Sequence, residues 1–213
     1  MFKRLVSLVS VVAAVSIAVA AARVRVEAQT VAVVSDGAKF SVAGALQRPP
    51  DYREWVYLTS GLGMTYGPTQ PGAGEPRFFD NVFVNRESYR LFMQSGRWPD
   101  KTQFILEIRQ SEQKASINNG GQTQGAKVLA IESAVKDVAR FPGTGWGYFD
   151  FGGGDTLKAE TAPLPTTERC YACHRDNTAV ENTFVQFYPT LMEVAQRMGT
   201  VKPTYDPSHK VAQ

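Results

Sequence analysis

The chain has 213 residues, a formal net charge of +3, and 43% hydrophobic and 11% aromatic residues. This composition allows a folded core and excludes a disordered chain, and two cysteines exclude a disulfide framework. The basic excess lies in residues 1–28, which leaves residues 29–213 formally neutral. A neutral domain has no general electrostatic attraction to nucleic acid, and we expect no nucleic-acid partner.

Residues 1–28 predict a secretory signal peptide. Lys3 and Arg4 form a short positive region, and an apolar run from Leu5 to Ala22 follows. Small residues after the run offer cleavage sites. An uncleaved membrane anchor is the alternative, because a run of this length is close to the lower limit for a membrane span. Both readings place the rest of the chain outside the cytoplasm, and export by a signal peptide predicts the periplasm.

The first half of the exported chain predicts short elements around a strand. Residues 29–48 are expected to be an N-terminal arm, and residues 49–200 one domain. A short helix is expected to begin at Asp51 and carry Tyr52, Trp55 and Val56. A loop rich in Gly and Pro follows over 61–76, and then a strand over 79–84.

The middle of the chain continues this pattern. Asn85 is expected to cap a helix that ends at Gly96. A strand over 103–109 places Phe104, Leu106 and Ile108 on one face. The polar residues 110–126 predict a long hairpin-type loop.

The last part of the chain supplies two strands and two helices. The strands are expected over 127–135 and 146–151, and a short helix after Thr166 and Thr167 carries a cysteine motif. A final helix is predicted over 183–198, in which Pro189 is either a kink or the first turn. Residues 201–213 are expected to be a flexible tail. The element order predicts an α+β fold, with an antiparallel β-sheet and flanking helices.

The motif Cys170-Tyr171-Ala172-Cys173-His174 carries the chemistry. In C-x-x-C-H the two thiols bond covalently to the vinyl groups of haem and the histidine ligates the iron. Both cysteines of the chain are used in this way. The motif therefore predicts one haem c, bound near the C-terminal part of the chain through Cys170 and Cys173, with His174 as the metal ligand.

Other readings of the two cysteines are less well supported. A redox C-x-x-C pair expects a thioredoxin-like βαβ context that the sequence lacks. A structural zinc site needs four ligands, and His209 is the only other histidine. A disulfide across so short a loop contributes little stability.

The sixth position of the iron decides between function classes. An electron-transfer cytochrome needs a second strong ligand, usually His or Met. The candidates after the motif are Met192 and Met198 on the last helix, expected to be core or surface residues, and His209 in the tail. The residues therefore favour a five-coordinate haem with an open, mostly apolar distal side that either binds small neutral ligands or carries out oxidations at the iron.

Several stretches together resemble the cytochrome P460 family and its relative cytochrome c′-beta. They span most of residues 49–190: Asp51–Val56, Val82–Tyr89, Gly96–Asp100, Ile131–Asp137, Cys170–His174 and Phe184–Pro189. The resemblance implies an antiparallel sheet with flanking helices, a haem with one protein axial ligand, a homodimer, and a periplasmic location.

The resemblance also distinguishes two branches by one residue. In cytochrome P460 a strand lysine is bonded to the porphyrin, and this accompanies hydroxylamine oxidation. In cytochrome c′-beta that bond is missing, and an apolar pocket binds nitric oxide and carbon monoxide. Alignment places Leu106 at the lysine position, and the nearest lysine, Lys101, precedes the strand in a turn. Leu106 therefore favours an apolar distal wall without the cross-link.

Glu132 is the candidate catalytic residue, because the resemblance places it where the P460 branch has a proton-transferring carboxylate. It alternates with Val128, Ala130 and Ala134, and this face either lines the haem pocket or looks to solvent while Leu129 and Ile131 face the core. The resemblance favours the pocket.

Two further candidate residues are predicted on less specific grounds. Phe79 is a further candidate for the pocket wall, and Arg175 for holding a haem propionate, with a surface role as its alternative.

Three functions follow from these residues. The first is a periplasmic mono-haem cytochrome that binds nitric oxide or a similar small ligand and works with a redox partner cytochrome. The second is an enzyme that oxidises hydroxylamine or a related nitrogen compound. The third is an electron-transfer cytochrome.

Overall fold

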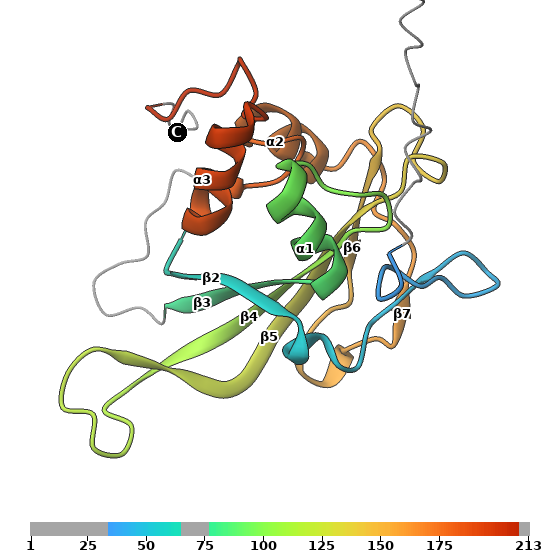
Figure 1. Ribbon diagram of the computed structural model, residues 1–213. Coiled ribbons are helices and arrows are strands. Elements are labelled where there is room, and N and C mark those ends of the chain that lie inside the picture. The colour runs from blue at the N-terminus through green and yellow to red at the C-terminus, as the bar shows by residue number, and fades with distance from the viewer. Residues whose placement is uncertain (1–33, 65–76, 209–213) are drawn as a thin grey trace, which may run out of the picture. The chain divides into compact units, whose positions relative to one another are not determined.

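A five-stranded antiparallel sheet in the order β2-β3-β4-β5-β6 forms the centre of the fold (Figure 1). The computed structural model describes residues 34–64 and 77–208, all within the unit Val31–Gln213. The sheet strands are β2 (Val56–Leu62), β3 (Phe78–Val84), β4 (Gln103–Gln113), β5 (Gln122–Lys136) and β6 (Trp146–Asp150). A small second ladder pairs β1 (Leu46–Gln47) with β7 (Glu160–Thr161).

Three α-helices lie over one face of the large sheet (Figure 1). They are α1 (Arg86–Ser95), α2 (Arg169–Asn177) and α3 (Pro189–Met198), with the 3-10 turns η1 (Tyr52–Glu54), η2 (Gly154–Thr156) and η3 (Val185–Phe187) between other elements. The α+β class with an antiparallel sheet and flanking helices is therefore confirmed. Within the described part of the chain, no helix combines the length and hydropathy needed to cross a membrane. The predicted signal peptide lies outside the described residues.

Strand alternation gives each face of the sheet its own hydrophobic core. On the helix face, Val84, Phe104 and Tyr148 pack with Phe92 of α1 and Leu191 of α3. On the opposite face, a second cluster covers the sheet with residues from β1 and η1: Leu46, Tyr52, Ile105, Ile131, Val135, Phe149 and Phe151. The sheet is thus buried on both faces over much of its length.

Helix α1 follows the prediction at its ends, with one difference at the N-cap. Gly96 ends the helix in the left-handed conformation (φ 67°), and its N–H donates to the Phe92 carbonyl at 2.7 Å. Asn85 occupies the N-cap, but its side chain makes no capping bond. Instead its amide donates to Asp36 and its Oδ1 accepts from the Gln103 N–H, both at 2.9 Å. Asn85 therefore joins the helix start to the N-terminal segment and β4.

The short helix predicted from Asp51 is only one 3-10 turn long. It ends before Trp55, and Val56 already begins β2, a strand that the sequence reading did not predict. The register of β2 against β3 shifts between Tyr57 and Thr59. This irregularity disturbs the alternation that identifies a strand. Of the loop predicted over 61–76, the part from residue 65 on lies outside the described residues.

The loop predicted over residues 110–126 is wrong over most of its length. Strands β4 and β5 continue through it in a paired ladder that ends at Gln113 opposite Gln122. Ser111 also pairs with Gln124 across this ladder. Polar residues on both faces hide such a strand, because sequence reading depends on alternation of apolar and polar residues.

The predicted final helix divides into two elements. The 3-10 turn η3 comes first, and α3 then starts at Pro189. Of the two alternatives for Pro189, a kink or the first turn, the structure shows the first turn. Packing against the helix-face core continues beyond residue 200 through Val201 and Tyr205. Of the predicted tail, residues 209–213 lie outside the described residues.

Candidate functional site

Helix α2 presents the cysteine motif to a cavity of about 550 Å³ between this helix and the sheet. Cys170 and Cys173 are one helical turn apart and therefore lie on the same side of α2. Both are free thiols, both are half-buried, and both line the cavity together with His174. The motif thus supplies three reactive groups to one wall.

The ring of His174 is fixed in one orientation by three neighbours. It packs against the rings of Tyr148 and Phe184, with centroids 4.4 and 4.6 Å away. Its Nδ1 lies 2.8 Å from the Asn182 carbonyl oxygen. A carbonyl can only accept, so Nδ1 carries the proton and Nε2 is the nitrogen with a free lone pair. Burial lowers the His174 pKa to about 4, so the imidazole is neutral at pH 7, as a metal ligand must be.

The loop that carries the Asn182 carbonyl is tied to the sheet side of the molecule. Trp98 donates from Nε1 to the Thr183 hydroxyl at 2.9 Å, and this contact is buried. Lys136 of β5 forms an ion pair with Glu181 at 2.7 Å. These contacts hold the acceptor of His174 in place, which is the supporting role that partners of a metal-binding histidine usually have.

The opposite wall of the cavity is the helix face of the sheet. Val82 of β3, Leu106 of β4 and Glu132 of β5 are direct cross-strand neighbours and form one row on this wall. Ala134 continues the wall along β5. The sheet therefore places Leu106 and Glu132 in the cavity wall. Leu106 lies between Val82 of β3 and Glu132 of β5.

Two carboxyl groups belong to this wall, Glu132 and the unpredicted Asp80 of β3. Among the described residues, neither has a hydrogen-bond or ion-pair partner. Burial raises the pKa of Asp80 to about 6. Burial also raises the pKa of Glu132, and the negative charges of Asp150 and Asp80 raise it further. Both groups therefore hold their protons more tightly than an ordinary carboxyl does.

The side-chain alternation predicted around Glu132 is correct on its C-terminal side, at Ala134, and wrong on its N-terminal side, at Val128. Ala134 shares the cavity wall, whereas Val128 packs into the core on the opposite face. The reason is a register shift, in which Ile108 pairs with Ala130 but Arg109 pairs with Val128. The extra residue at the bulge reverses the direction of the side chains beyond it.

Phe79 does not belong to the cavity wall, which corrects that prediction. Its neighbours Asp80 and Val82 line the cavity, and strand alternation turns Phe79 toward the other face of the sheet. Phe79 pairs directly with Arg109, whose side chain donates to Glu107 on that other face.

Arg175 is exposed and pairs with Asp176 at 2.7 Å, which is the surface role. Arg169, six residues earlier at the start of α2, lines the cavity instead, and the sequence analysis does not name it. Its place directly before the first cysteine was the available sequence clue.

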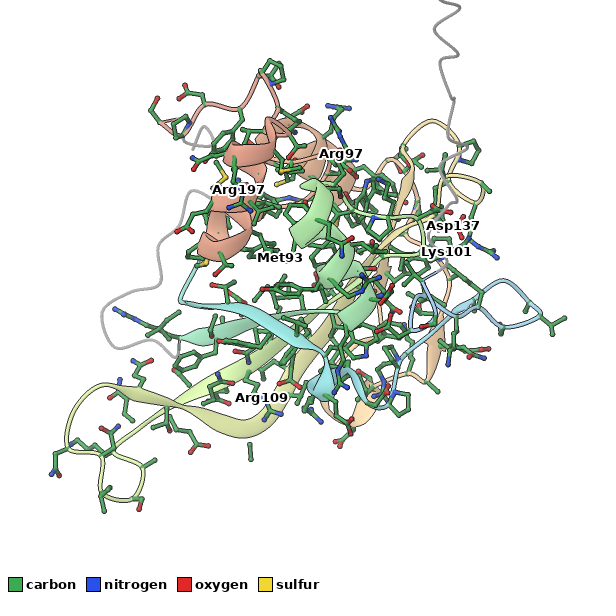
Figure 2. All side chains as sticks on the ribbon, viewed as in Figure 1. Met93, Arg97, Lys101, Arg109, Asp137 and Arg197 are labelled. Carbon is green, nitrogen blue, oxygen red and sulfur yellow. The ribbon has the colours of Figure 1, made fainter. Side chains whose placement is uncertain are left out.

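Lys101 is far from a position to replace Leu106. It lies in the turn before β4 with a positive φ of 67°, and its ammonium group forms an ion pair with the buried Asp137. Figure 2 shows the two labelled residues close to one another. Its amine is therefore engaged in holding the turn to the end of β5.

Met64 is a cavity residue that the sequence reading missed. The candidate Met198 is exposed on α3, and Met192 packs on the helix-face core. Neither belongs to the cavity wall, and His209 lies outside the described residues. Met64 follows β2 and lies over Gly61, where a Cβ would collide with its sulfur. It precedes the motif, whereas the candidates considered were those that follow it.

The residues present fit a haem. The cavity has a volume typical of cofactor sites, and most of its wall is apolar. The Tyr148 hydroxyl is buried in this wall and has no hydrogen-bond partner among the described residues. A buried donor without a partner costs free energy, which a group bound in the cavity can recover. Cys170, Cys173 and His174 would hold the haem, and Tyr148 packs beside them.

Comparison with known families identifies the chain. The family model described as Cytochrome P460 matches residues 49–185, which is more than half of the chain and includes the motif. The chain belongs to the cytochrome P460 family. This membership confirms the resemblance and indicates a haem c cytochrome. A search of curated proteins gives no significant match. Leu106 and Glu132 lie inside the matched segment, whereas Phe187 and Tyr188 of the cavity lie beyond it.

Proposed function

We propose that the chain is a periplasmic mono-haem c-type cytochrome with a five-coordinate haem that binds small neutral ligands such as nitric oxide. The observation that carries the proposal is the opposition of two walls in one cavity. His174 offers Nε2 from α2, and the facing sheet wall presents the apolar Leu106 and Val82. A haem held there by Cys170, Cys173 and His174 would supply an iron that can take such a ligand.

The residues of the chain contribute positioning and polarity to this function. Cys170 and Cys173 would anchor one edge of the haem, and the Nδ1–H bond to Asn182 orients the imidazole. Leu106 and Val82 would keep water away from the bound ligand, because an apolar wall offers water no hydrogen bonds. Glu132 can hold a proton near the ligand, since its pKa is raised by burial and by neighbouring charges.

The covalent attachment is tested by replacing the cysteines. We expect Cys170→Ala and Cys173→Ala together to abolish haem that stays bound after acid–acetone extraction, and each single variant to retain at most one thioether bond. Mass spectrometry of the intact protein measures the haem mass. Ala172→Ser is the control for Cys170→Ala, because Ala172 lies in the same turn of α2 and forms no bond to the haem in the proposal. It should keep the full haem mass. Haem still covalently attached in the double variant would contradict the assignment.

The coordination state is tested by absorption spectroscopy and ligand binding. We expect a high-spin spectrum in the ferric and ferrous protein, and binding of nitric oxide and carbon monoxide after reduction. A strongly red-shifted band of the cross-linked type would contradict the role of Leu106. A low-spin, six-coordinate spectrum in both oxidation states would contradict the open position.

Met64 supports a second candidate, an electron-transfer cytochrome. Its thioether lies in the cavity, and Met is one of the two usual sixth ligands. A six-coordinate spectrum that becomes high-spin in Met64→Leu would establish this function. Leu has a similar volume but offers no lone pair, so the substitution removes only the ligand.

The two cavity carboxyls support a third candidate, oxidation of hydroxylamine or a related nitrogen compound. Such an oxidation releases protons, and Asp80 and Glu132 can accept them. Turnover of hydroxylamine with an artificial electron acceptor, lost in Glu132→Gln, would establish this activity. No turnover above free haem would exclude it.

The proposal includes a homodimer and a redox partner cytochrome. Support for an interface comes from exposed apolar side chains on the two neighbouring strands β2 and β3, namely Tyr57, Leu62 and Phe78. Such residues on an edge strand and its neighbour are suited to protein contacts. Sedimentation of the holoprotein measures the oligomeric state, and a monomer at micromolar concentration would contradict the dimer.

A further inference from the structure

Asp80 is an ionisable group of the cavity that the proposed ligand binding does not require. It projects from β3 on the same wall as Val82 and Leu106. A Cβ placed on Gly61 would lie 3.6 Å from Asp80 Oδ2 and would collide with Met64, so both side chains lie over this glycine. The missing side chain at Gly61 leaves room for Met64, and Gly61, Met64 and Asp80 all line the cavity.

Glu132 lies on the same wall, two strands away from Asp80. The two carboxyls are placed diagonally, since Glu132 is in the row of Val82 and Leu106 while Asp80 is two residues before Val82. They are close enough for the charge of Asp80 to raise the pKa of Glu132. The wall that faces the motif therefore carries two negative charges when both groups are ionised.

Positive charge around this wall is sparse. Among the described residues, the other titratable groups that face the two carboxyls or line the cavity are Asp150 and Tyr148 on β6, Tyr188 directly before α3, and Arg169, Cys170, Cys173 and His174 on α2. Both cysteines would be consumed by thioether bonds, His174 is neutral, and burial raises the Tyr148 pKa so that the phenol stays neutral. Arg169 is the one cation that lines the cavity within the described ranges, and it belongs to the opposite wall. Within residues 34–64 and 77–208, no positive charge lowers the pKa of either carboxyl.

We propose that Asp80 and Glu132 act as an electrostatic filter that repels anions from the ligand side of the haem and admits neutral molecules. This inference rests on the proposed function, because it assumes a haem ligand site that faces the sheet. A charge at close range in a poorly solvated cavity changes the binding of another charge by several-fold or more, whereas it hardly affects an uncharged ligand. Ligand charge therefore becomes a criterion of selection beside ligand size.

The filter depends on pH in a defined direction. Asp80 loses its negative charge as the pH falls through about 6, because burial raises its pKa to that value. Glu132 also becomes neutral at a higher pH than an ordinary glutamate. Repulsion of anions is therefore complete in alkaline solution and weakens as the solution is acidified.

The test compares an anionic and a neutral ligand on the holoprotein. Azide is titrated into the ferric protein and carbon monoxide into the ferrous protein, from about pH 5 to about pH 8. The variants are Asp80→Asn, Glu132→Gln and both together. Asp155→Asn is the matched control, because Asp155 is exposed on η2 and is not part of the cavity wall.

We expect Asp80→Asn to increase azide affinity roughly tenfold at about pH 8 and much less at about pH 5. Carbon monoxide affinity should change less than twofold, and Asp155→Asn should change neither. The reduction potential of the haem should rise in the double variant, which reports the loss of negative charge without any added ligand. Equal azide affinity in all variants at about pH 8, with normal carbon monoxide binding, would overturn the filter.

A different result would overturn the proposed function itself. If neither carbon monoxide nor nitric oxide binds the reduced protein, no open ligand site exists. Binding of the neutral ligand therefore distinguishes a failure of the filter, in which carbon monoxide still binds, from a failure of the proposed function, in which it does not.

Discussion

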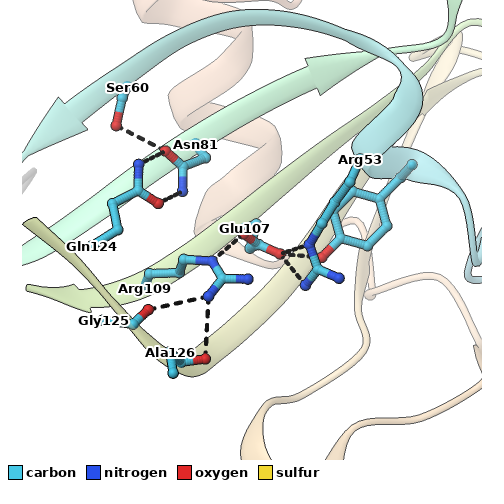
Figure 3. Close-up of polar contacts among 9 residues, drawn as sticks. Arg53, Ser60, Asn81, Glu107, Arg109, Gln124, Gly125 and Ala126 are labelled. Carbon is cyan, nitrogen blue, oxygen red and sulfur yellow. Dashed lines mark hydrogen bonds and ion pairs between the residues drawn. The ribbon is translucent and has the colours of Figure 1, made fainter.

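The two faces of the five-stranded sheet differ in whether their buried carboxyl groups have hydrogen-bond donors. On the face away from the helices, Glu107 of β4 is almost fully buried and accepts hydrogen bonds from Tyr52, Arg53 and Arg109, with Arg53 Nε at 2.9 Å (Figure 3). On the helix face, Asp80 and Glu132 have no such partners among the described residues. The same sheet therefore stabilises one carboxylate and leaves two others uncompensated.

The pKa values follow this difference. Burial alone would raise the Glu107 pKa, but the hydrogen bonds from Arg109, Tyr52 and Arg53 outweigh burial and lower it. Burial raises the pKa of Asp80 without any opposing contact. Uncompensated ionisable groups in a cavity are a mark of functional sites, whereas satisfied networks are a mark of structural ones.

The satisfied face extends further along the sheet. Asn81 and Gln124 exchange two hydrogen bonds of 2.7 and 2.9 Å, and Ser60 donates to the same Asn81 oxygen at 2.9 Å (Figure 3). Asn81 and Asp80 are adjacent in sequence and point to opposite faces. One step along β3 thus separates a fully bonded amide from a carboxyl that has no partner in the described part of the chain.

Glu107→Ala should give the largest effect, because it removes the acceptor shared by three donors. We expect the free energy of unfolding to fall by about 4 kcal/mol at pH 7, as for other buried charge networks that lose one partner. Urea unfolding of the holoprotein measures the change. Glu112→Ala, on the exposed end of the same strand, is the control and should cost less than about 0.5 kcal/mol. A loss below about 1 kcal/mol in Glu107→Ala would contradict the structural role of this network.

Tyr52→Phe should give a smaller loss by removing one donor to the same carboxylate. The Tyr52 hydroxyl is buried and donates to Glu107, and hydrogen bonds to charged groups contribute about 2 kcal/mol. In Glu107→Gln the same substitution should cost less, since the charge is gone. A double-mutant cycle of the two residues measures this coupling, and additive effects would show that they do not interact.

Asp80→Asn should have the smallest effect on stability, and the opposite sign. An aspartate whose pKa is raised from 3.8 to about 6 destabilises the folded state increasingly as the pH rises through this interval. Removing the charge should therefore raise the free energy of unfolding by about 1 kcal/mol at pH 8, after allowance for partial solvent exposure, and change it little near pH 4. Urea midpoints at both pH values test this, and an equal shift at both would contradict an origin in ionisation.

The sequence could predict which residues of the motif meet at the cavity better than it could predict the facing wall. Cys170, Cys173 and His174 were predictable because their spacing has a direct chemical meaning. Leu106 and Glu132 followed from strand alternation combined with the family resemblance. Asp80 was not predictable, because β3 carries apolar residues on both faces, such as Phe83 and Val82, and alternation then cannot tell which face is which.

The missed residues have physical reasons of the same kind. Phe79 was assigned to the wrong face for the reason that concealed Asp80. Met64 follows β2 at the start of the segment rich in Gly and Pro, and a sixth ligand is expected after the motif rather than before it. The three-dimensional pairing of strands decided these positions, and a single sequence does not contain it in readable form.

The bond from His174 Nδ1 to the Asn182 carbonyl has a consequence for how the site can change over evolution. The acceptor is a backbone atom, so replacement of the Asn182 side chain leaves it in place. Only a change in the path of the chain between α2 and η3, such as an inserted or deleted residue, can move that oxygen. The position of the proton on the His174 ring thus depends on the length of this loop. It tolerates point substitutions at Asn182, which would remove the bond if a side chain provided the acceptor.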